Sequence, residues 1–155
     1  MLLRILIVCT GNTCRSPMAE ALLKAKIKLV GLQNKITVQS AGLAASSPEP
    51  ASIGAKQALL KRGLDVGRHE SQLVTVEYVK AADLILTMTV RHKAYLLNAF
   101  PEARGKVNTL AEYAEDPQDV IDPFGGSLAD YERCAVMLDK LLTKAWIKIC
   151  QQAGE

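Results

Sequence analysis

The sequence of 155 residues lacks three features that would point to particular classes of protein. No apolar stretch approaches the roughly 18 residues of a membrane span, so we expect no membrane partner. There is no run of five or more basic residues, and 19 basic against 16 acidic residues give a net charge of only +3, which does not favour nucleic acid. The N-terminal MLLRILIV has neither the basic leader nor the cleavage site of a signal peptide. We therefore expect a cytoplasmic protein.

Cysteine is scarce and unevenly spaced, at positions 9, 14, 134 and 150. This spacing does not resemble a secreted disulfide framework. Zinc is disfavoured because neither His69 nor His92 has finger spacing and the last two cysteines fall in the predicted final helix, where we expect them to be buried. We therefore do not expect a zinc site, and Cys9 and Cys14 become candidates for chemistry.

Apolar patterning predicts alternating strands and helices. Four short apolar or β-branched segments are typical of strands: residues 2–8, 35–42, 83–89 and 106–110. Helices are expected over 18–29, 53–63, 76–81 and 90–99, and a polar loop to Gly126 precedes a long helix from Leu128. Such alternation indicates parallel strands with right-handed crossovers. We therefore predict a single α/β domain over residues 1–155, with a four-stranded parallel sheet flanked by helices on both faces.

The segment VCTGNTCRSP, residues 8–17, connects the first strand to the first helix. Ser16 is a good N-cap and Pro17 a good first helical residue, so the loop before them should expose backbone N–H groups at a helix N-terminus. Gly11 can take the positive φ that such a loop needs, and Asn12 tolerates a left-handed conformation. The segment therefore predicts an anion site at the carboxyl edge of the sheet, beside Cys9.

The chemistry of this loop suits a phosphoryl group. A helix N-terminus and a nearby guanidinium favour a thiolate, so Cys9 is a candidate nucleophile. Arg15 can bind two phosphoryl oxygens with its planar fork. The residues between them complete the expected cradle: Thr10, Gly11, Asn12, Thr13 and Cys14. A cysteine six residues before an arginine also occurs by chance, so this loop alone leaves a structural interpretation open.

A second loop, IDPFGGS at 121–127, supplies a carboxylate. Asp122 stands before a proline among apolar residues, and a partly desolvated carboxyl suits a general acid near neutral pH. Phe124 offers a wall for a substrate side chain. Taken by itself, an Asp-Pro before two glycines is usually a turn. Its pairing with the first loop makes Asp122 the candidate general acid.

With both loops, CTGNTCRSPMAE and DPFGGS, the chain resembles the low-molecular-weight protein tyrosine phosphatase family over essentially its full length. The resemblance implies a cysteinyl-phosphate intermediate and no metal or cofactor. It implies that Cys9 is the nucleophile, Arg15 binds phosphate, Asp122 is the general acid and Ser16 carries the hydroxyl that steadies the thiolate. Three further residues match the polar network that holds the loop in shape: Asn12, Ser40 in QSAG and His69 in RHES.

Thr13 bears on the substrate. Family members that act on phosphotyrosine usually have a branched aliphatic residue here, whereas bacterial protein-arginine phosphatases have threonine in CTGNTCRS together with DPFGGS. This sequence resembles the latter in both motifs. A hydroxyl removes an apolar wall and adds a polar group, so Thr13 and Phe124 are the candidate specificity residues. The resemblance implies phosphoarginine in proteins as the substrate, with phosphotyrosine as the alternative.

The sequence argues against two other functions. Arsenate reductases share this fold and first loop but need additional redox cysteines, and residues 80–95 contain none. A phosphate-binding module without catalysis would not need Asp122. We therefore expect a cysteine-dependent protein phosphatase, acting on phosphorylated proteins and present as a monomer.

Overall fold

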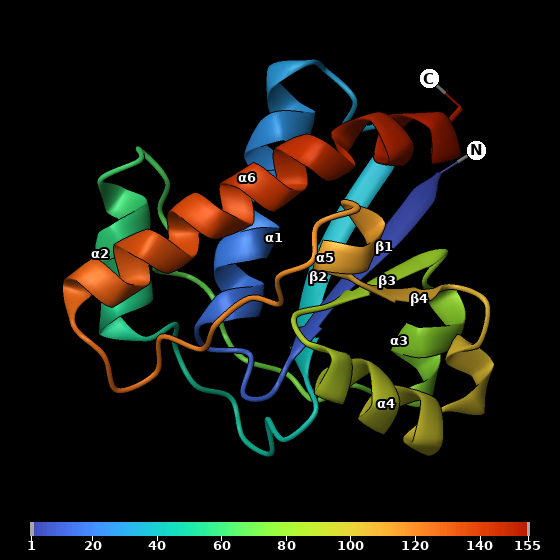
Figure 1. Cartoon of the computed structure of the whole chain (residues 1–155), viewed down its shortest axis with the longest axis horizontal. Helices are drawn as coiled ribbons and strands as arrows, with labels where there is room; N and C mark the ends of the chain where they lie inside the picture. Colours follow the sequence, from blue (N-terminus) through green and yellow to red (C-terminus); the bar gives the residue numbers. More distant parts are fainter. Residues whose placement is uncertain (1, 155) are drawn as a thin grey trace.

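The computed structural model describes residues 2–154 and is built around a parallel sheet with strand order β2-β1-β3-β4 (Figure 1). The strands are β1 (Leu3–Cys9), β2 (Ile36–Gly42), β3 (Leu84–Thr87) and β4 (Val107–Thr109). The helices are α1 (Arg15–Leu29), α2 (Ile53–Leu60), α3 (Val76–Ala81), α4 (Val90–Ala99), α5 (Leu110–Tyr113) and α6 (Leu128–Gln152), with a 3₁₀ turn at Pro101–Ala103. The predicted α/β fold class is confirmed.

The two faces of the sheet are covered by different helices. In β1, Ile5 and Ile7 point into a core formed with α1, α2 and α6, whereas Leu6 and Val8 point into a core formed with α3 and α4. Figure 1 shows these two groups of helices on opposite sides of the strands. Because both faces are buried, the first strand reads in the sequence as a continuous apolar run.

Most helix predictions agree with the structure. The bounds predicted for α3 and α4 are those observed, and α6 buries the face that the sequence predicts: Tyr131, Ala135, Leu138, Leu142, Ala145 and Ile149. Helix α1 ends as the glycine rule predicts. Gly31 adopts φ +73°, and the N–H of Leu32 donates to the carbonyl of Ile27 at 3.0 Å, which satisfies a terminal carbonyl.

The predicted polar loop after β4 is wrong at its start, because Leu110 begins α5 rather than ending a strand. Thr109 forms a capping box with Glu112: its hydroxyl accepts from the Glu112 N–H at 2.9 Å, and the Glu112 carboxylate accepts from the Thr109 N–H at 2.8 Å. The Thr-x-x-Glu spacing that signals this helix is present in the sequence. The 3₁₀ turn at Pro101–Ala103 was also not predicted.

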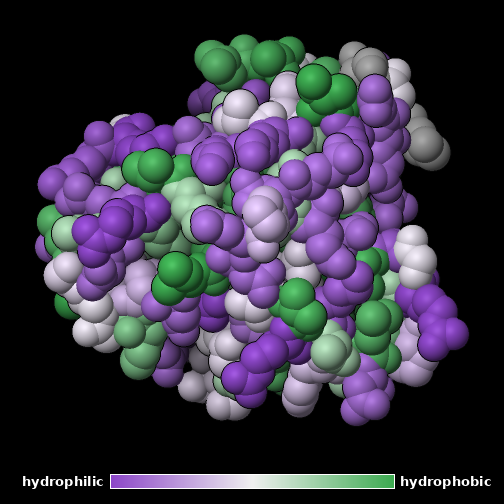
Figure 2. All heavy atoms as spheres, in the orientation of Figure 1, coloured by the Kyte–Doolittle hydropathy of each residue, from purple (hydrophilic) through white to green (hydrophobic). Residues whose placement is uncertain are grey.

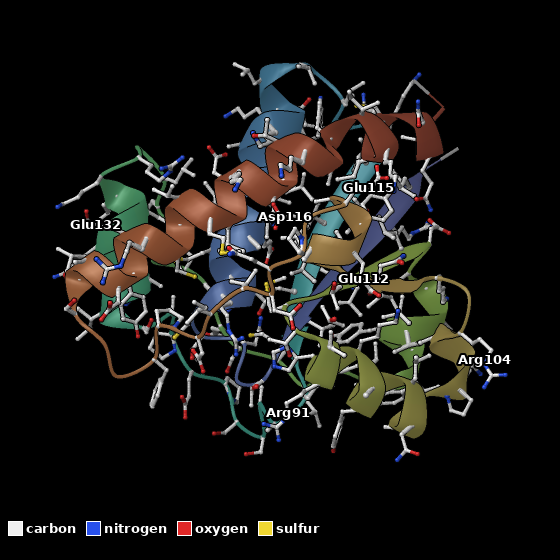
Figure 3. The ribbon with its side chains drawn as sticks, in the orientation of Figure 1. Arg91, Arg104, Glu112, Glu115, Asp116 and Glu132 are labelled. Carbon is white, nitrogen blue, oxygen red and sulfur yellow. The ribbon has the colours of Figure 1, made fainter. Side chains whose placement is uncertain are left out.

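Ion pairs tie the residues after α5 to α6, where Figure 3 shows Glu115 and Asp116 beneath the long helix. The Asp116 carboxylate accepts from Lys144 at 2.8 Å, and Glu115 lies 3.7 Å from Lys148. The Glu115 pair is exposed on both sides and contributes little to stability, whereas the Asp116 side chain is only 6% exposed. These ion pairs hold the residues after α5 against α6, and this is where the loop that carries Asp122 begins.

The surface around α6 is mainly hydrophilic (Figure 2). Over residues 2–154, no helix combines the length and the apolar character that crossing a bilayer requires.

Candidate active site

The loop between β1 and α1 lies at the carboxyl edge of the sheet. Strand β1 pairs with β2 on one side and with β3 on the other, so the strand order reverses beside it. Ligands of open α/β sheets bind at such a position. A cavity of about 320 Å³ opens there, lined by Cys9, Arg15, Asp122 and neighbouring loop residues.

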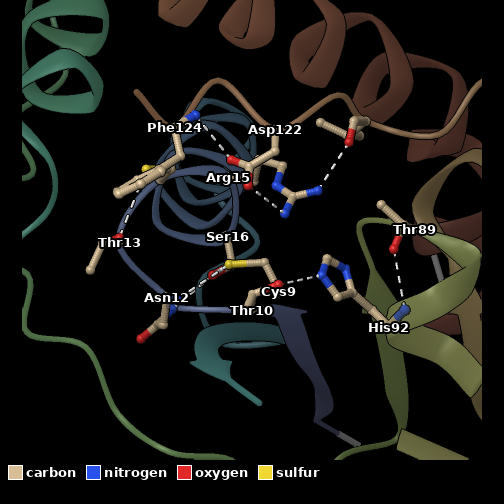
Figure 4. Close-up of polar contacts among 12 residues, drawn as sticks. Cys9, Thr10, Asn12, Thr13, Arg15, Ser16, Thr89, His92, Asp122 and Phe124 are labelled. Carbon is tan, nitrogen blue, oxygen red and sulfur yellow. Dashed lines mark hydrogen bonds and ion pairs between the residues drawn. The ribbon is translucent and has the colours of Figure 1, made fainter. Parts of the chain in front are cut away.

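The sulfur of Cys9 is surrounded by hydrogen-bond donors (Figure 4). The Asn12 N–H donates to Sγ at 3.3 Å, and the Ser16 Oγ lies 2.9 Å from Sγ. The Asn12 side-chain amide donates to the same Ser16 Oγ at 2.8 Å, so that oxygen already acts as an acceptor and its own hydrogen is free for the sulfur. Two donors aimed at one buried sulfur stabilise a thiolate.

Asn12 is the centre of this network. It is fully buried and adopts φ +57°, the left-handed conformation that the sequence predicts it to tolerate. Its amide nitrogen also donates to Ser40 Oγ at 2.9 Å, and its amide oxygen accepts from the Gln72 N–H at 3.0 Å. The His69 Nε2–H donates to its backbone carbonyl at 2.6 Å. Every polar group of the Asn12 side chain therefore has a partner from another segment of the chain.

The network continues to the rim of the molecule through Glu20. Ser40 accepts from Asn12 and donates to the Glu20 carboxylate at 2.5 Å. The Lys24 ammonium pairs with the other Glu20 oxygen, also at 2.5 Å. The buried amide is thus linked to an anion on α1.

Two local predictions for this loop are wrong. Helix α1 begins at Arg15, so Ser16 and Pro17 are its second and third residues, and Ser16 is not an N-cap. The reason is that the Ser16 hydroxyl serves Cys9 and Asn12 instead of the helix backbone. Gly11 is not among the residues with positive φ; Asn12 takes that conformation in its place.

Arg15 projects from the first turn of α1 and is 5% exposed. Its guanidinium donates to the Val120 carbonyl at 3.1 Å and lies 3.4 Å from the Asp122 carboxylate. These two contacts leave further N–H donors of the fork for other acceptors, since a guanidinium has five. Figure 4 shows the guanidinium between the Asp122 carboxylate and the loop that holds Cys9.

Asp122 and Phe124 form the opposite side of the cavity. The Asp122 carboxylate accepts from the Phe124 N–H at 3.1 Å, which fixes the turn of the loop. The Asp122 side chain is 50% exposed, so the partial desolvation expected from its apolar neighbours is only half realised. Phe124 is 76% exposed and lines the cavity as an aromatic wall.

Thr10, Gly11, Thr13 and Cys14 line the same cavity. The Cys14 thiol is buried and donates to Ser52 Oγ at 3.3 Å, at the N-terminus of α2. It therefore packs beneath the loop while keeping one edge toward the cavity.

The sequence reasoning missed His92, which lies on α4. Its Nε2 is 2.9 Å from the Thr10 hydroxyl, and the ring is buried beside Arg15. Burial, and then the charge of Arg15, lower the pKa of His92 to about 4, so the imidazole is neutral. A lone histidine on a helix offers no signal of this contact, because α4 is 82 residues from Thr10 in the sequence.

The remaining cysteines do not face the cavity. Cys134 is buried in α6, as the sequence predicts, whereas Cys150 is only partly buried. Burial raises the pKa of Cys134 to about 12, so it stays a neutral thiol. Within residues 2–154, no three side chains of the metal-binding types His, Cys, Asp and Glu are close enough to hold a metal ion.

A buried cysteine ringed by donors, a helix N-terminus, a guanidinium and a loop carboxylate define the class of cysteine-dependent phosphatases. Residues 4–153 match the family model described as low molecular weight phosphotyrosine protein phosphatase. The chain belongs to this family.

Relatives and solved structures support this assignment. The chain is 44% identical to a protein-arginine-phosphatase of Bacillus subtilis (strain 168), over 89% of this chain and 91% of the relative. It is 32% identical to the low molecular weight protein-tyrosine-phosphatase Etp of Escherichia coli (strain K12), over 93% and 92%. The fold matches a solved structure of YwlE arginine phosphatase, a cysteine-to-serine variant with a phosphorylated active-site serine, with a TM-score of 0.89 and 41% identity, over 96% of both chains.

Proposed function

We propose that this protein removes phosphate from phosphoarginine side chains of other proteins through a phosphocysteine on Cys9. The observation that carries the proposal is the position of Thr13, whose side chain lines the cavity with Cys9, Arg15 and Phe124. A polar, branched side chain suits a planar guanidinium better than it suits a phenyl ring. Two similar relatives, at 44% and 41% identity, are named protein-arginine-phosphatases.

In the first step the Cys9 thiolate attacks phosphorus, the P–N bond breaks, and the leaving guanidine nitrogen takes a proton from the Asp122 carboxyl. In the second step water attacks the phosphocysteine, the S–P bond breaks, and the water proton passes to the Asp122 carboxylate. Arg15 and the loop N–H groups hold the phosphoryl oxygens in both steps. Inorganic phosphate leaves, and the enzyme returns to its starting protonation state.

The polar network has a supporting role in this mechanism. Ser16 and the Asn12 N–H stabilise the attacking sulfur and, in the second step, the sulfur as leaving group. Ser40 and His69 hold Asn12 in its left-handed conformation. The loop is therefore preorganised before substrate binds, so less free energy is lost in arranging it.

Phosphotyrosine is the second candidate substrate, and the exposed ring of Phe124 is the observation that favours it. An aromatic side chain at the mouth of the cavity can stack on a phenyl ring. Etp, the relative from Escherichia coli, is named a protein-tyrosine-phosphatase.

The ratio of kcat/KM on phosphoarginine and phosphotyrosine forms of one protein substrate tests the proposal. We expect a native preference for phosphoarginine and a shift of roughly 10- to 200-fold toward phosphotyrosine in Thr13→Ile, the scale of one or two methyl groups in a pocket. Thr13→Val, which removes the hydroxyl and keeps the shape, and Thr13→Ser, which keeps the hydroxyl, separate the two properties. A native preference for phosphotyrosine would support the second candidate.

The same experiment tests the chemistry with two further variants. Cys9→Ser should eliminate turnover on both substrates, and acid-quenched native enzyme should carry phosphate on Cys9. Arg15→Lys should lose most of its turnover on both substrates, because the point charge of a lysine does not replace a guanidinium that binds two phosphoryl oxygens side by side.

We further propose that residues 1–155 act as one domain, as a monomer and in the cytoplasm. The four cysteines are unevenly spaced and do not resemble a secreted disulfide framework, which suits a reducing compartment. Light scattering on the purified protein should give the mass of one chain.

A further inference from the structure

His92 is held firmly at the start of α4. The backbone N–H of His92 donates to the hydroxyl of the N-cap Thr89 at 3.2 Å. The backbone N–H of Val90, the first residue of the helix, donates to the Asp119 carboxylate at 2.9 Å. The ring is 7% exposed and reaches across to the loop after Cys9, as Figure 4 shows. Its position is thus set by the helix terminus and by the loop that also carries Asp122.

The hydrogen-bond partners fix the tautomer. The imidazole is neutral because burial and Arg15 lower the pKa of His92 to about 4, so it carries one N–H. Nδ1 is buried and has no hydrogen-bond partner among the described residues, whereas Nε2 faces Thr10 Oγ1 at 2.9 Å. Since a buried N–H without an acceptor is rare and costly, the proton belongs on Nε2. His92 is therefore the donor and Thr10 the acceptor.

This direction determines what the Thr10 hydroxyl can do. Its oxygen accepts from His92, and the Thr10 backbone carbonyl accepts from the Ala44 N–H at 2.9 Å, so both the side chain and the main chain are anchored. The hydroxyl hydrogen must then point away from His92. Thr10 lines the cavity that holds Cys9 and Arg15, where an acceptor oxygen of a phosphoryl group would lie.

We infer that His92 is a positioning residue for phosphate binding: its Nε2–H orients the Thr10 hydroxyl so that this hydroxyl donates to a phosphoryl oxygen. The inference rests on the proposed function of the Cys9 site and adds to it a residue outside the loop. It assigns the neutral imidazole to orientation and leaves the positive charge of the site to Arg15.

The experiment compares four variants of the full chain: His92→Leu, which removes the donor; His92→Gln, which keeps a side-chain N–H; Thr10→Val, which removes the hydroxyl; and the double variant His92→Leu/Thr10→Val. The measurements are kcat and KM on an aryl phosphate, the inhibition constant of inorganic phosphate and the melting temperature. Thr37→Val, an exposed threonine on β2, is the matched control.

We expect His92→Leu and Thr10→Val each to weaken phosphate inhibition and lower kcat/KM by roughly 2- to 10-fold, the scale of one net hydrogen bond. The double variant should lose no more than the larger single loss, because both changes remove the same contact. His92→Gln should recover most of the activity, and Thr37→Val should match the native enzyme.

Additive losses in the double variant would overturn the inference, as would a native inhibition constant in Thr10→Val. A lower melting temperature in His92→Leu with unchanged phosphate inhibition would also overturn it, because that pattern indicates packing alone. If His92→Leu does not fold, Thr10→Val decides, since Thr10 is exposed. Absence of turnover in the native enzyme on both an aryl phosphate and a phosphoarginine protein would instead contradict the proposed function.

Discussion

The hydrogen bond from Ser16 to Cys9 gives the sharpest test of the site. Ser16 is fully buried, and its hydroxyl is committed to the sulfur because Asn12 already donates to its oxygen. A hydrogen bond to a charged group contributes about 1.5–3 kcal/mol. Ser16→Ala should therefore lower kcat/KM on an aryl phosphate at neutral pH by roughly 10- to 150-fold.

The loss of the Asn12 partner is a second effect of this substitution, and Ser40→Ala provides the control for it. Ser40 accepts from the same Asn12 amide but does not touch the sulfur. The assay is the rate of Cys9 alkylation by iodoacetamide, located by mass spectrometry, together with kcat/KM. Ser16→Ala should slow alkylation far more than Ser40→Ala. Equal effects of the two variants would mean that Ser16 only shapes the loop, and the reasoning from hydrogen-bond direction would be refuted.

Three further predictions concern protons and redox. Asp122→Asn should slow substrates with poor leaving groups by roughly 10²–10⁴-fold relative to activated aryl phosphates, and equal losses on both would exclude general acid catalysis. Mild peroxide should inactivate the enzyme and thiol reductant should restore it through a Cys9–Cys14 disulfide; equally complete recovery in Cys14→Ser would exclude that protection. Because the pKa of His92 falls from 6.5 to about 4 on folding, the unfolded chain binds the proton first, and stability is lost as pH falls from about 6.5 to 4. The free energy of unfolding, measured with urea, should fall between pH 6.5 and pH 4 by about 3 kcal/mol less in His92→Gln than in the native protein. An identical dependence of this free energy on pH in the two proteins would contradict the prediction.

The fold was largely predictable because each element has a local signal. The continuous apolar run of β1 follows from burial on both faces, and the spacing of apolar residues in α6 follows from one buried stripe. The missed helix α5 had a capping signal, Thr109 to Glu112, but only four residues of helix behind it. A helix that short depends on tertiary contacts, such as the burial of Tyr113, more than on its own periodicity.

The site was predictable where one residue type is required by the chemistry. A nucleophile, a planar cation and a carboxylate have few substitutes, so Cys9, Arg15 and Asp122 could be proposed from the sequence. The conformation of the loop could not, because Gly11 and Asn12 both tolerate positive φ and only the partners of the side chains decide between them. The Asn12 side chain gains three hydrogen-bonded neighbours in that conformation, Ser16, Ser40 and Gln72, which glycine, having no side chain, does not offer.

The amide of Asn12 also explains why the network has one direction. An amide nitrogen donates and does not accept, so the hydroxyls of Ser16 and Ser40 both receive a hydrogen bond from Asn12 and both pass their own hydrogen outward. One hydrogen goes to the carboxylate of Glu20 and the other to the sulfur of Cys9. Glu20 and Cys9 therefore each receive a hydrogen bond from a serine hydroxyl that is itself oriented by Asn12. Since Glu20 accepts this hydrogen bond as an anion, the same arrangement suits Cys9 as an anion. The two hydrogen-bond partners of the sulfur are the Ser16 hydroxyl and the Asn12 N–H, and neither is the guanidinium of Arg15, which keeps further N–H donors for the phosphoryl group.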